Sequence, residues 1–217
     1  MSLPTNPPRM LTELPAPMLI EPVTLEGQSI RLEPLSLDYF YPLCDIALDE
    51  DLWRWSPAPV KTRDDLRHYI ELALTRAAEG SVLPFATFDK VANRFVGSTR
   101  FLDIDKQHHH VEIGSTFIGK AWQRTAVNTE AKYLMLRHVF ETWGCLRVAF
   151  QTDALNTRSR NAILRLGAQQ EGLFRNHKIC ADGRVRDSIF FSIIDSDWPA
   201  VKANLEAKLA RPYVPKF

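Results

Sequence analysis

The stretch between Gly119 and Ala131 has the composition of an anion-binding turn. It lies between a segment that alternates like a strand and a segment with helical apolar spacing, so it joins a strand to a helix. The first N–H groups of a helix have no partner within the helix, and the helix dipole makes that end positive. Such ends bind phosphate and other anions. Arg124, inside the turn, adds a positive side chain.

A second polar pair begins another helix about thirty residues farther along the chain. Asn156 and Ser159 precede a short apolar-periodic segment that Gly167 ends. Asn and Ser are preferred helix N-caps, because their side chains accept hydrogen bonds from free N–H groups. The same side chains can instead bind a ligand at that end. Both interpretations stay open for the pair.

The elements that must position these residues can be read from periodicity and turn residues. Strands are expected at 24–25, 29–32, 82–88, 95–104, 111–117, 146–150, 168–174 and 186–194. Helices are expected from Ser36 to Ala47, from Thr62 to Gly80, over 128–143, over 156–166 and after Ser196. The order of these elements predicts the α+β class, with one mixed, mostly antiparallel sheet and helices on both faces.

Three sets of residues together resemble the GCN5-related N-acetyltransferase superfamily. Gln123, Ala126 and Asn128 occupy the defining positions of its Q/R-x-x-G-x-G/A motif, although Ala and Asn replace the usual small residues. The run 129–131 (Thr-Glu-Ala) and the N-x-x-S pattern of Asn156 are similar to the ribosomal-protein acetyltransferase branch. The resemblance spans roughly residues 22 to 199. It implies the acyl-CoA N-acyltransferase fold.

The resemblance also implies a co-substrate, acetyl-CoA or another acyl-CoA. Its pyrophosphate would lie on the backbone of the turn, and its pantetheine arm would lie between two splayed strands, 113–117 and 146–151. Gly114 could aid that splay or be a packing concession. The residues expected to bind the co-substrate are Phe117, Gln123, Arg124, Thr125, Ala126, Val127, Asn128, Thr129 and Asn156.

Transfer of an acyl group to an amine requires that the amine lose a proton, and an α-amine, with a pKa of about 8, needs only a weak base. Glu112, beside the expected thioester site, is the first candidate for that base; an ordinary solvated or salt-bridged carboxylate is the alternative. Glu171 is the reserve candidate. On the other side of the thioester, the resemblance implies that Ser159 could donate a proton to the departing thiolate.

Acceptor binding is expected from Trp53, Trp55 and His110. The two Trp residues lie in a break between helices where the superfamily builds its acceptor wall, although core packing would explain them equally well. His110 ends a run of three histidines. Because consecutive strand residues point to opposite faces, the run is not expected to hold a metal.

Composition limits the classes of function. The 27 basic and 26 acidic residues give a net charge of +1, which disfavours binding to nucleic acid or anionic lipid. Residues 119–190 carry 12 basic and 6 acidic side chains, whereas residues 38–80 carry 5 and 9, so we expect an amine to approach past the acidic half. Three unpatterned cysteines and the absence of a leader or long apolar segment predict a cytoplasmic protein with free thiols.

The chain divides into a Pro-rich arm (1–21), one acyltransferase domain (22–199) and a C-terminal helix and tail (200–217). The expected acceptor is a primary amine, either a protein N-terminus or a small molecule. Three alternatives stay open: a larger donor such as succinyl-CoA, a small amine such as a polyamine, and a CoA-binding module without catalysis. A homo-oligomer is also possible.

Overall fold

The computed structural model describes residues 10–11, 13, 15–211 and 213. In this part of the chain, one sheet contains the strands β1 (Leu25–Glu26), β2 (Ile30–Pro34), β3 (Leu83–Asp89), β4 (Arg94–Asp105), β5 (His110–Ile118), β6 (Arg147–Asp153), β7 (Gln169–Ile179) and β8 (Val185–Ile194). The helices are α1 (Phe40–Ala47), α2 (Arg63–Ala78), α3 (Val127–Arg137), α4 (Thr157–Leu166) and α5 (Trp198–Leu209). Most of the expected arm, residues 1–21, lies outside the described residues.

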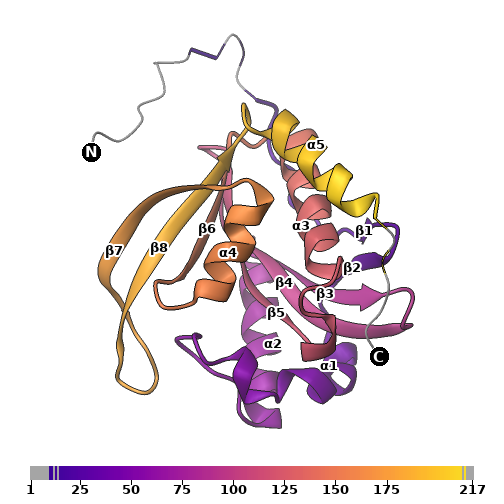
Figure 1. The fold of residues 1–217 in the computed structure, drawn as a ribbon, viewed down its shortest axis with the longest axis vertical. Coiled ribbons are helices and arrows are strands. Elements are labelled where there is room, and N and C mark those ends of the chain that lie inside the picture. The colour runs from indigo at the N-terminus through magenta and orange to yellow at the C-terminus, as the bar shows by residue number, and fades with distance from the viewer. Residues whose placement is uncertain (1–9, 12, 14, 212, 214–217) are drawn as a thin grey trace.

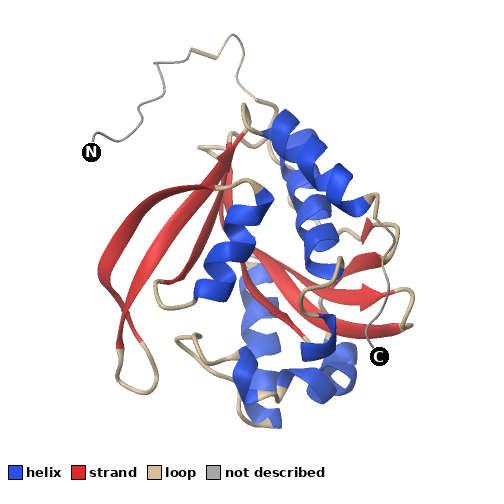
Figure 2. Cartoon of the chain, viewed as in Figure 1, coloured by secondary structure: helices blue, strands red, loops and turns tan. Residues whose placement is uncertain are grey.

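The sheet has the order β1-β2-β3-β4-β5-β6-β8-β7. Its neighbours are antiparallel except for β5 and β6, which run parallel at its centre. Figures 1 and 2 show the first half of the sheet diverging from the long β7–β8 hairpin. The α+β prediction, with a single mixed and mostly antiparallel sheet, is confirmed.

Helices cover both faces of this sheet. Consecutive strand residues point to opposite faces. Arg100 of β4 contacts Tyr69 of α2, whereas Phe101, the next residue, packs against His138 just after α3. Helices α1 and α2 therefore lie on one face and α3 on the other. Helix α5 packs along α3 (Figure 1), and its Val201 and Leu205 belong to the same hydrophobic core as the sheet.

Several local expectations are confirmed by hydrogen bonds. Thr62 and Asp65 form the reciprocal capping box that begins α2. Gly167 ends α4 with φ of 109°, a left-handed value that favours glycine. By contrast, Ser36 caps a short 3-10 turn ahead of α1, not α1 itself. The helix expected over 128–143 is α-helical only to Arg137 and continues as a wider π-helical turn, His138–Thr142.

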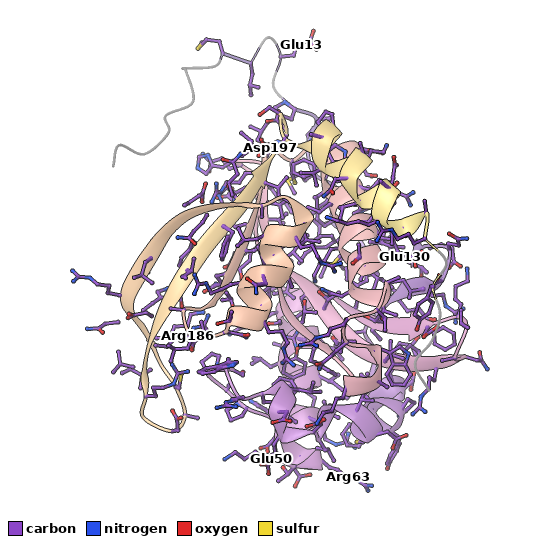
Figure 3. The ribbon with its side chains drawn as sticks, viewed as in Figure 1. Glu13, Glu50, Arg63, Glu130, Arg186 and Asp197 are labelled. Carbon is purple, nitrogen blue, oxygen red and sulfur yellow. The ribbon has the colours of Figure 1, made fainter. Side chains whose placement is uncertain are left out.

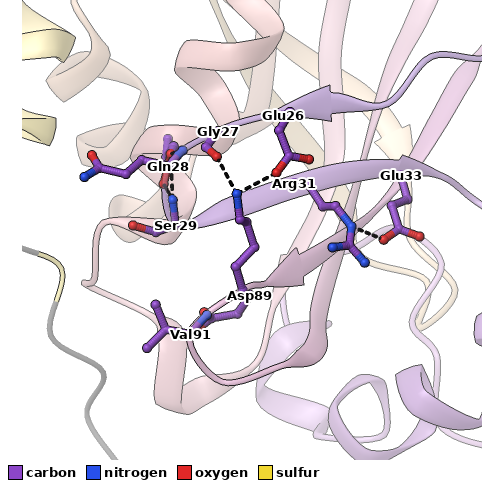
Figure 4. A network of polar contacts seen from close by, with 10 residues as sticks. Glu26, Gly27, Gln28, Ser29, Arg31, Glu33, Asp89 and Val91 are labelled. Carbon is purple, nitrogen blue, oxygen red and sulfur yellow. Dashed lines mark hydrogen bonds and ion pairs between the residues drawn. The ribbon is translucent and has the colours of Figure 1, made fainter.

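Helix α3 is fixed to the far end of the sheet through Glu130 (Figure 3). Its carboxylate accepts hydrogen bonds from the backbone N–H groups of Gln28 and Ser29 in the β1–β2 turn. Lys90 holds the same turn from the other side by donating to the carbonyl of Gly27 and to Glu26 (Figure 4). These hydrogen bonds attach the first part of α3 to the β1–β2 turn. The sheet therefore fixes the orientation of that end of the helix.

The cysteines at 44, 145 and 180 are free and buried, as expected. Within the described ranges, no helix combines the length and the apolar character that crossing a bilayer requires.

Candidate active site

The two central parallel strands separate where the sequence predicted a splay. The pairing of β5 with β6 covers only His110 to Glu112 against Arg147 to Ala149, although both strands continue well beyond it. Ser115 has a left-handed φ of 46°, and the β4–β5 register shifts at this point, so β5 bulges away from a straight path. The expectation of splayed strands is therefore confirmed. The opening begins directly after Glu112.

Glu112 is buried at the point of the splay. Its side-chain Oε2 accepts a hydrogen bond of 2.7 Å from Gln151 Nε2 of β6. Burial raises the pKa of this carboxyl to about 7, although the hydrogen bond from Gln151 opposes the shift. A carboxylate with this pKa can take a proton from an amine near neutral pH.

Gly114 makes room for that carboxyl. A Cβ atom at this position would lie 2.9 Å from Glu112 Oε1 and 2.9 Å from Leu102 Cδ1, closer than real Cβ contacts. Gln151 also has an unused hydrogen-bond acceptor. Its Oε1 atom is buried and has no hydrogen-bond partner in the described chain. Glu112 and Gln151 therefore present two oxygens that an amine could contact.

The N-terminus of α3 has no side-chain cap. Ala126 stands at the N-cap position and cannot offer one. Arg124 is exposed and has a left-handed φ of 60°, which turns the chain sharply ahead of the helix. The first N–H groups of α3 are therefore left to an external acceptor such as phosphate, apart from that of Val127, which reaches Thr125 Oγ1 at 3.3 Å.

The side chains of this turn mostly hold the loop itself. Gln123 donates to the carbonyl of Ile118 at 3.1 Å and accepts from Arg158 of α4 at 2.7 Å. Thr125 Oγ1 donates to the carbonyl of Trp122 at 2.6 Å. Val127 is fully buried, and Thr129 accepts from Arg165 of α4 at 2.7 Å. The contribution of these residues to a ligand would therefore come from the backbone.

Asn128 and Phe117 occupy different surroundings. Asn128 lies in the first turn of α3, not in the preceding loop, and its Oδ1 atom is buried without a hydrogen-bond partner in the described part of the chain. Phe117 of β5 is buried and packs against Trp53 and Tyr69, with ring centroids 5.2 and 6.0 Å away. Phe117 therefore lines the opening through its backbone.

The two helix N-termini meet beside the splay, since Arg158 of α4 bonds to Gln123 in the turn before α3. Asn156 caps α4, because its Oδ1 accepts from the N–H of Ser159 at 3.0 Å. The amide NH₂ of Asn156 is not used in that cap. Ser159 is partly buried, and its hydroxyl bonds to none of the described residues.

The three residues expected to bind the acceptor are spread over different positions. Trp53 is a core residue, because it is only 6% exposed and its Nε1 donates to the carbonyl of Ala47 at 2.6 Å. Trp55 is partly buried, and the guanidinium groups of Arg54 and Arg184 lie 5.3 and 5.5 Å from the centre of its ring. His110 begins β5, two residues before Glu112, and its Nε2 lies 3.5 Å from Asp105.

Glu171 is poorly suited to the reserve role of base. Arg147 binds its carboxylate with both terminal nitrogens, and Ser192 donates to it at 2.8 Å. These hydrogen bonds, led by that of Arg147, lower the pKa of Glu171. The described residues also contain no group of three His, Cys, Asp or Glu side chains placed to hold a metal ion.

Lys132 was not singled out from the sequence. It is buried on α3, and its Nζ donates to Thr99 Oγ1 at 2.8 Å and to Thr116 Oγ1 at 2.7 Å. Burial lowers the pKa of this amine to about 7. When the amine is protonated, hydrogen bonds to the two hydroxyl groups stabilise it, and no carboxylate of the described residues forms an ion pair with it.

Replacing Lys132 with Met should therefore stabilise the protein by on the order of 1–3 kcal/mol near neutral pH. Between the folded-state pKa of about 7 and the ordinary value of 10.5, the unfolded chain binds a proton that the folded chain lacks. The free energy of unfolding of the native sequence therefore rises with pH in this window, and the advantage of Met should shrink. Urea unfolding at pH 7.5 and pH 10 measures both, with exposed Lys106→Met as the control. A pH-independent effect would contradict the burial of a titrating amine.

Comparison with known proteins assigns the family. Residues 29–169 match the model of the acetyltransferase (GNAT) domain, and this segment is more than half of the chain. The chain belongs to the GNAT acetyltransferase family. A GCN5-related N-acetyltransferase from Brucella melitensis, known from a crystal structure, is 31% identical to this GNAT chain. The match covers 91% of this chain and 90% of the other, with a TM-score of 0.81.

Two further relatives come from the ribosomal-protein branch. The GNAT chain is 26% identical to the [ribosomal protein uS5]-alanine N-acetyltransferase of Escherichia coli K12 over 120 residues. That match covers 55% of this chain but only 61% of the enzyme's length. Mycobacterium smegmatis RimJ, whose structure was solved in complex with CoA-disulfide, is 21% identical with a TM-score of 0.72, covering 82% of this chain and 88% of the other. This last likeness is one of fold.

Proposed function

We propose that the protein is an N-acetyltransferase that moves an acetyl group from acetyl-CoA directly to a primary amine, with a protein N-terminus as the first expected acceptor. The observation that carries the proposal is the separation of β5 from β6 directly after a buried Glu112, beside the uncapped N-terminus of α3. Membership of the GNAT family supports the donor, and the activity of the E. coli relative supports a protein acceptor.

The residues present fit the donor. The backbone N–H groups at the start of α3 offer donors to a pyrophosphate, and Arg124 supplies a nearby positive charge. Beyond Glu112, the edge of β5 that faces β6 is left unpaired by β6 and offers hydrogen bonds to an extended pantetheine arm. Asn156 at the start of α4 adds an amide donor to the same opening. These features together support the order phosphate, pantetheine, thioester along the splay.

In the proposed reaction the acceptor amine attacks the thioester carbonyl carbon. The new C–N bond forms as the C–S bond breaks, and the amine gives its surplus proton to Glu112. Ser159, whose hydroxyl bonds to none of the described residues, is the proposed proton donor to the departing thiolate, and it regains a proton from solvent as Glu112 releases its own. Because thiols have a pKa near 8.5, this step needs little acid catalysis. Positioning of the two reactants, worth roughly 7–11 kcal/mol, is the larger contribution.

A panel assay tests the proposal. Purified protein is mixed with acetyl-CoA or succinyl-CoA and with peptides, polyamines or aminoglycosides, and free CoA thiol is measured. We expect thiol release with acetyl-CoA and a peptide that has a free N-terminal amine, and none with the same peptide after chemical blocking of that amine. Faster release of CoA thiol with succinyl-CoA than with acetyl-CoA would identify succinyl-CoA as the preferred donor. Tight acetyl-CoA binding without release for any amine would identify a CoA-binding module in place of an enzyme.

A further inference from the structure

The face of the sheet that carries Glu112 continues over β6 and β8, where it carries polar, charged and aromatic side chains. Gln151 and Asp153 alternate on this face of β6, and their partners in β8 are Phe190 and Ser188. The β7–β8 turn reaches across to the loop between α1 and α2, where Ala181 donates to the carbonyl of Pro57 at 2.9 Å. We name these residues of one sheet face the acceptor face: Glu112, Gln151, Asp153, Arg186, Ser188 and Phe190, of which Glu112, Asp153, Arg186 and Ser188 are buried.

Arg186 on the acceptor face is a buried cation with incomplete pairing. Its side chain is 7% exposed, and its Nε donates to Ser188 Oγ at 3.0 Å. Its two terminal nitrogens, which form the bidentate edge of the guanidinium, bond to nothing in the described chain. A planar guanidinium edge of this kind matches a carboxylate.

The nearest carboxylate is already engaged. Asp153, 1% exposed, is bonded to Arg184 at 2.6 Å and stands 3.9 Å from Arg186 Nε. The single carboxylate of Asp153 thus lies within ion-pair distance of two guanidinium groups. Burial lowers the pKa of Arg186, with Asp153 opposing this only in part. The terminal nitrogens of Arg186 are not among the buried atoms that lack a partner, so they reach solvent, where a carboxylate can meet them.

The surplus positive charge lies within electrostatic range of the proposed base. Glu112 and Arg186 influence one another's pKa, and Lys178 of β7 adds a second cation to the surroundings of Glu112. Asp103 acts on the pKa of Glu112 in the opposite sense, so the local excess of positive charge is that of Arg184 and Arg186 over Asp153. A guanidinium without a full counter-ion attracts an acceptor with negative charge.

Strand geometry sets the distance between the proposed base, Glu112, and the guanidinium group of Arg186. Gln151 bonds directly to Glu112, and Asp153 lies two residues farther along β6, or about 7 Å. Arg186 Nε lies beside Asp153. The α-carboxylate of a free amino acid is too close to its own amine to span this gap. A side-chain carboxylate on the first or second residue of a peptide has the required reach.

We propose that the acceptor carries an acidic side chain beside its reacting amine, and that Arg186 binds this carboxylate while the amine faces Glu112 and Gln151. The proposal rests on the proposed function and specifies its substrate class. Acidic N-terminal peptides are therefore preferred over neutral ones, and over free amino acids that carry only an α-carboxylate.

The test compares matched acceptors with acetyl-CoA as donor. Two peptide pairs differ only by glutamate or glutamine, one pair at the first position and one at the second; free alanine and its amide form a third pair. For the native sequence we expect kcat/KM at least about tenfold higher for the acidic member of one or both peptide pairs. We expect no such preference within the alanine pair.

Variants of Arg186 and of a control arginine test whether Arg186 causes the preference for acidic peptides. Arg186→Gln should reduce the acidic preference to about onefold, because kcat/KM should fall more for the glutamate peptides than for the glutamine peptides, and Arg186→Lys should keep part of the preference. Arg175→Gln removes an exposed cation of β7 and should keep the preference in full. Thermal melting of each variant shows that it is folded, and the Arg186→Lys result stands if Arg186→Gln does not fold.

Equal or lower rates with acidic peptides in the native sequence would overturn the proposal, as would a preference that persists in both Arg186 variants. If no peptide is acetylated, the proposed function fails separately. Calorimetric titration of the same peptides into the protein saturated with CoA then decides the binding claim. Acidic peptides binding more tightly through Arg186 would uphold it, and the absence of binding or of any preference would overturn it.

Discussion

Ala126→Asp is expected to weaken acetyl-CoA binding by about 100-fold or more. Ala126 occupies the N-cap position of α3, where the free N–H groups face the proposed pyrophosphate. An Asp there would place a negative charge within a few ångströms of the phosphates and would compete with them for the same N–H groups. Isothermal titration calorimetry with acetyl-CoA measures the change.

This substitution separates binding from folding. A negative side chain near a helix N-terminus interacts favourably with the helix dipole, so the melting temperature of the variant should stay the same or rise. Ala126→Asn is the matched control, because Asn has nearly the same shape as Asp without the charge. Its acetyl-CoA affinity should fall much less than that of the Asp variant. Equal affinity in Ala126→Asp and the native sequence would remove the phosphate site from this helix end.

Glu112→Gln is expected to lower turnover by about 10²- to 10⁴-fold, the usual contribution of a general base. Burial raises the pKa of Glu112 to about 7, so the carboxyl is protonated and inactive below this pH and ionised above it. The rate of the native enzyme should therefore rise through pH 7 as Glu112 loses its proton. In the Gln variant this rise should move upward, toward the pKa of the amine itself, near 8 for an α-amine.

The controls for Glu112→Gln are internal to the site. Acetyl-CoA affinity should be unchanged, because the proposed phosphate site lies at the start of α3 and not at Glu112. Glu171→Gln should keep the pH profile of the native enzyme, since Glu171 is held in an ion pair with Arg147. A Glu112→Gln enzyme with near-normal turnover and the native pH profile would assign proton removal to water and not to Glu112.

Local features were predictable from the sequence because they depend on residues close together in the chain. The capping box of Thr62 and Asp65 and the left-handed Gly167 are examples. The turn before α3 and the position of Glu112 on its strand were found in the same way. The resemblance of Gln123 and Asn156 to family motifs supplied the splay, which periodicity alone does not give.

Features set by tertiary packing escaped prediction. A lysine is normally expected on the protein surface. Lys132 is buried because α3 lies between the sheet and α5, so most of its residues are buried. Trp53 and Trp55 are two residues apart, yet only the structure assigns Trp53 to the core. The pairing of Asp153 with Arg184 and Arg186 joins residues about thirty positions apart, so the excess of guanidinium groups over carboxylates at this place cannot be read from the overall charge balance.

The most direct test of the proposed site is a crystal structure of the protein with CoA and a peptide acceptor. We expect the pyrophosphate oxygens within hydrogen-bonding distance of the backbone N–H groups at the start of α3. We expect the sulfur between β5 and β6, with the peptide amine beside Glu112 and Gln151. CoA bound away from the α3 N-terminus, or a peptide amine remote from Glu112, would contradict the assignment of the active site.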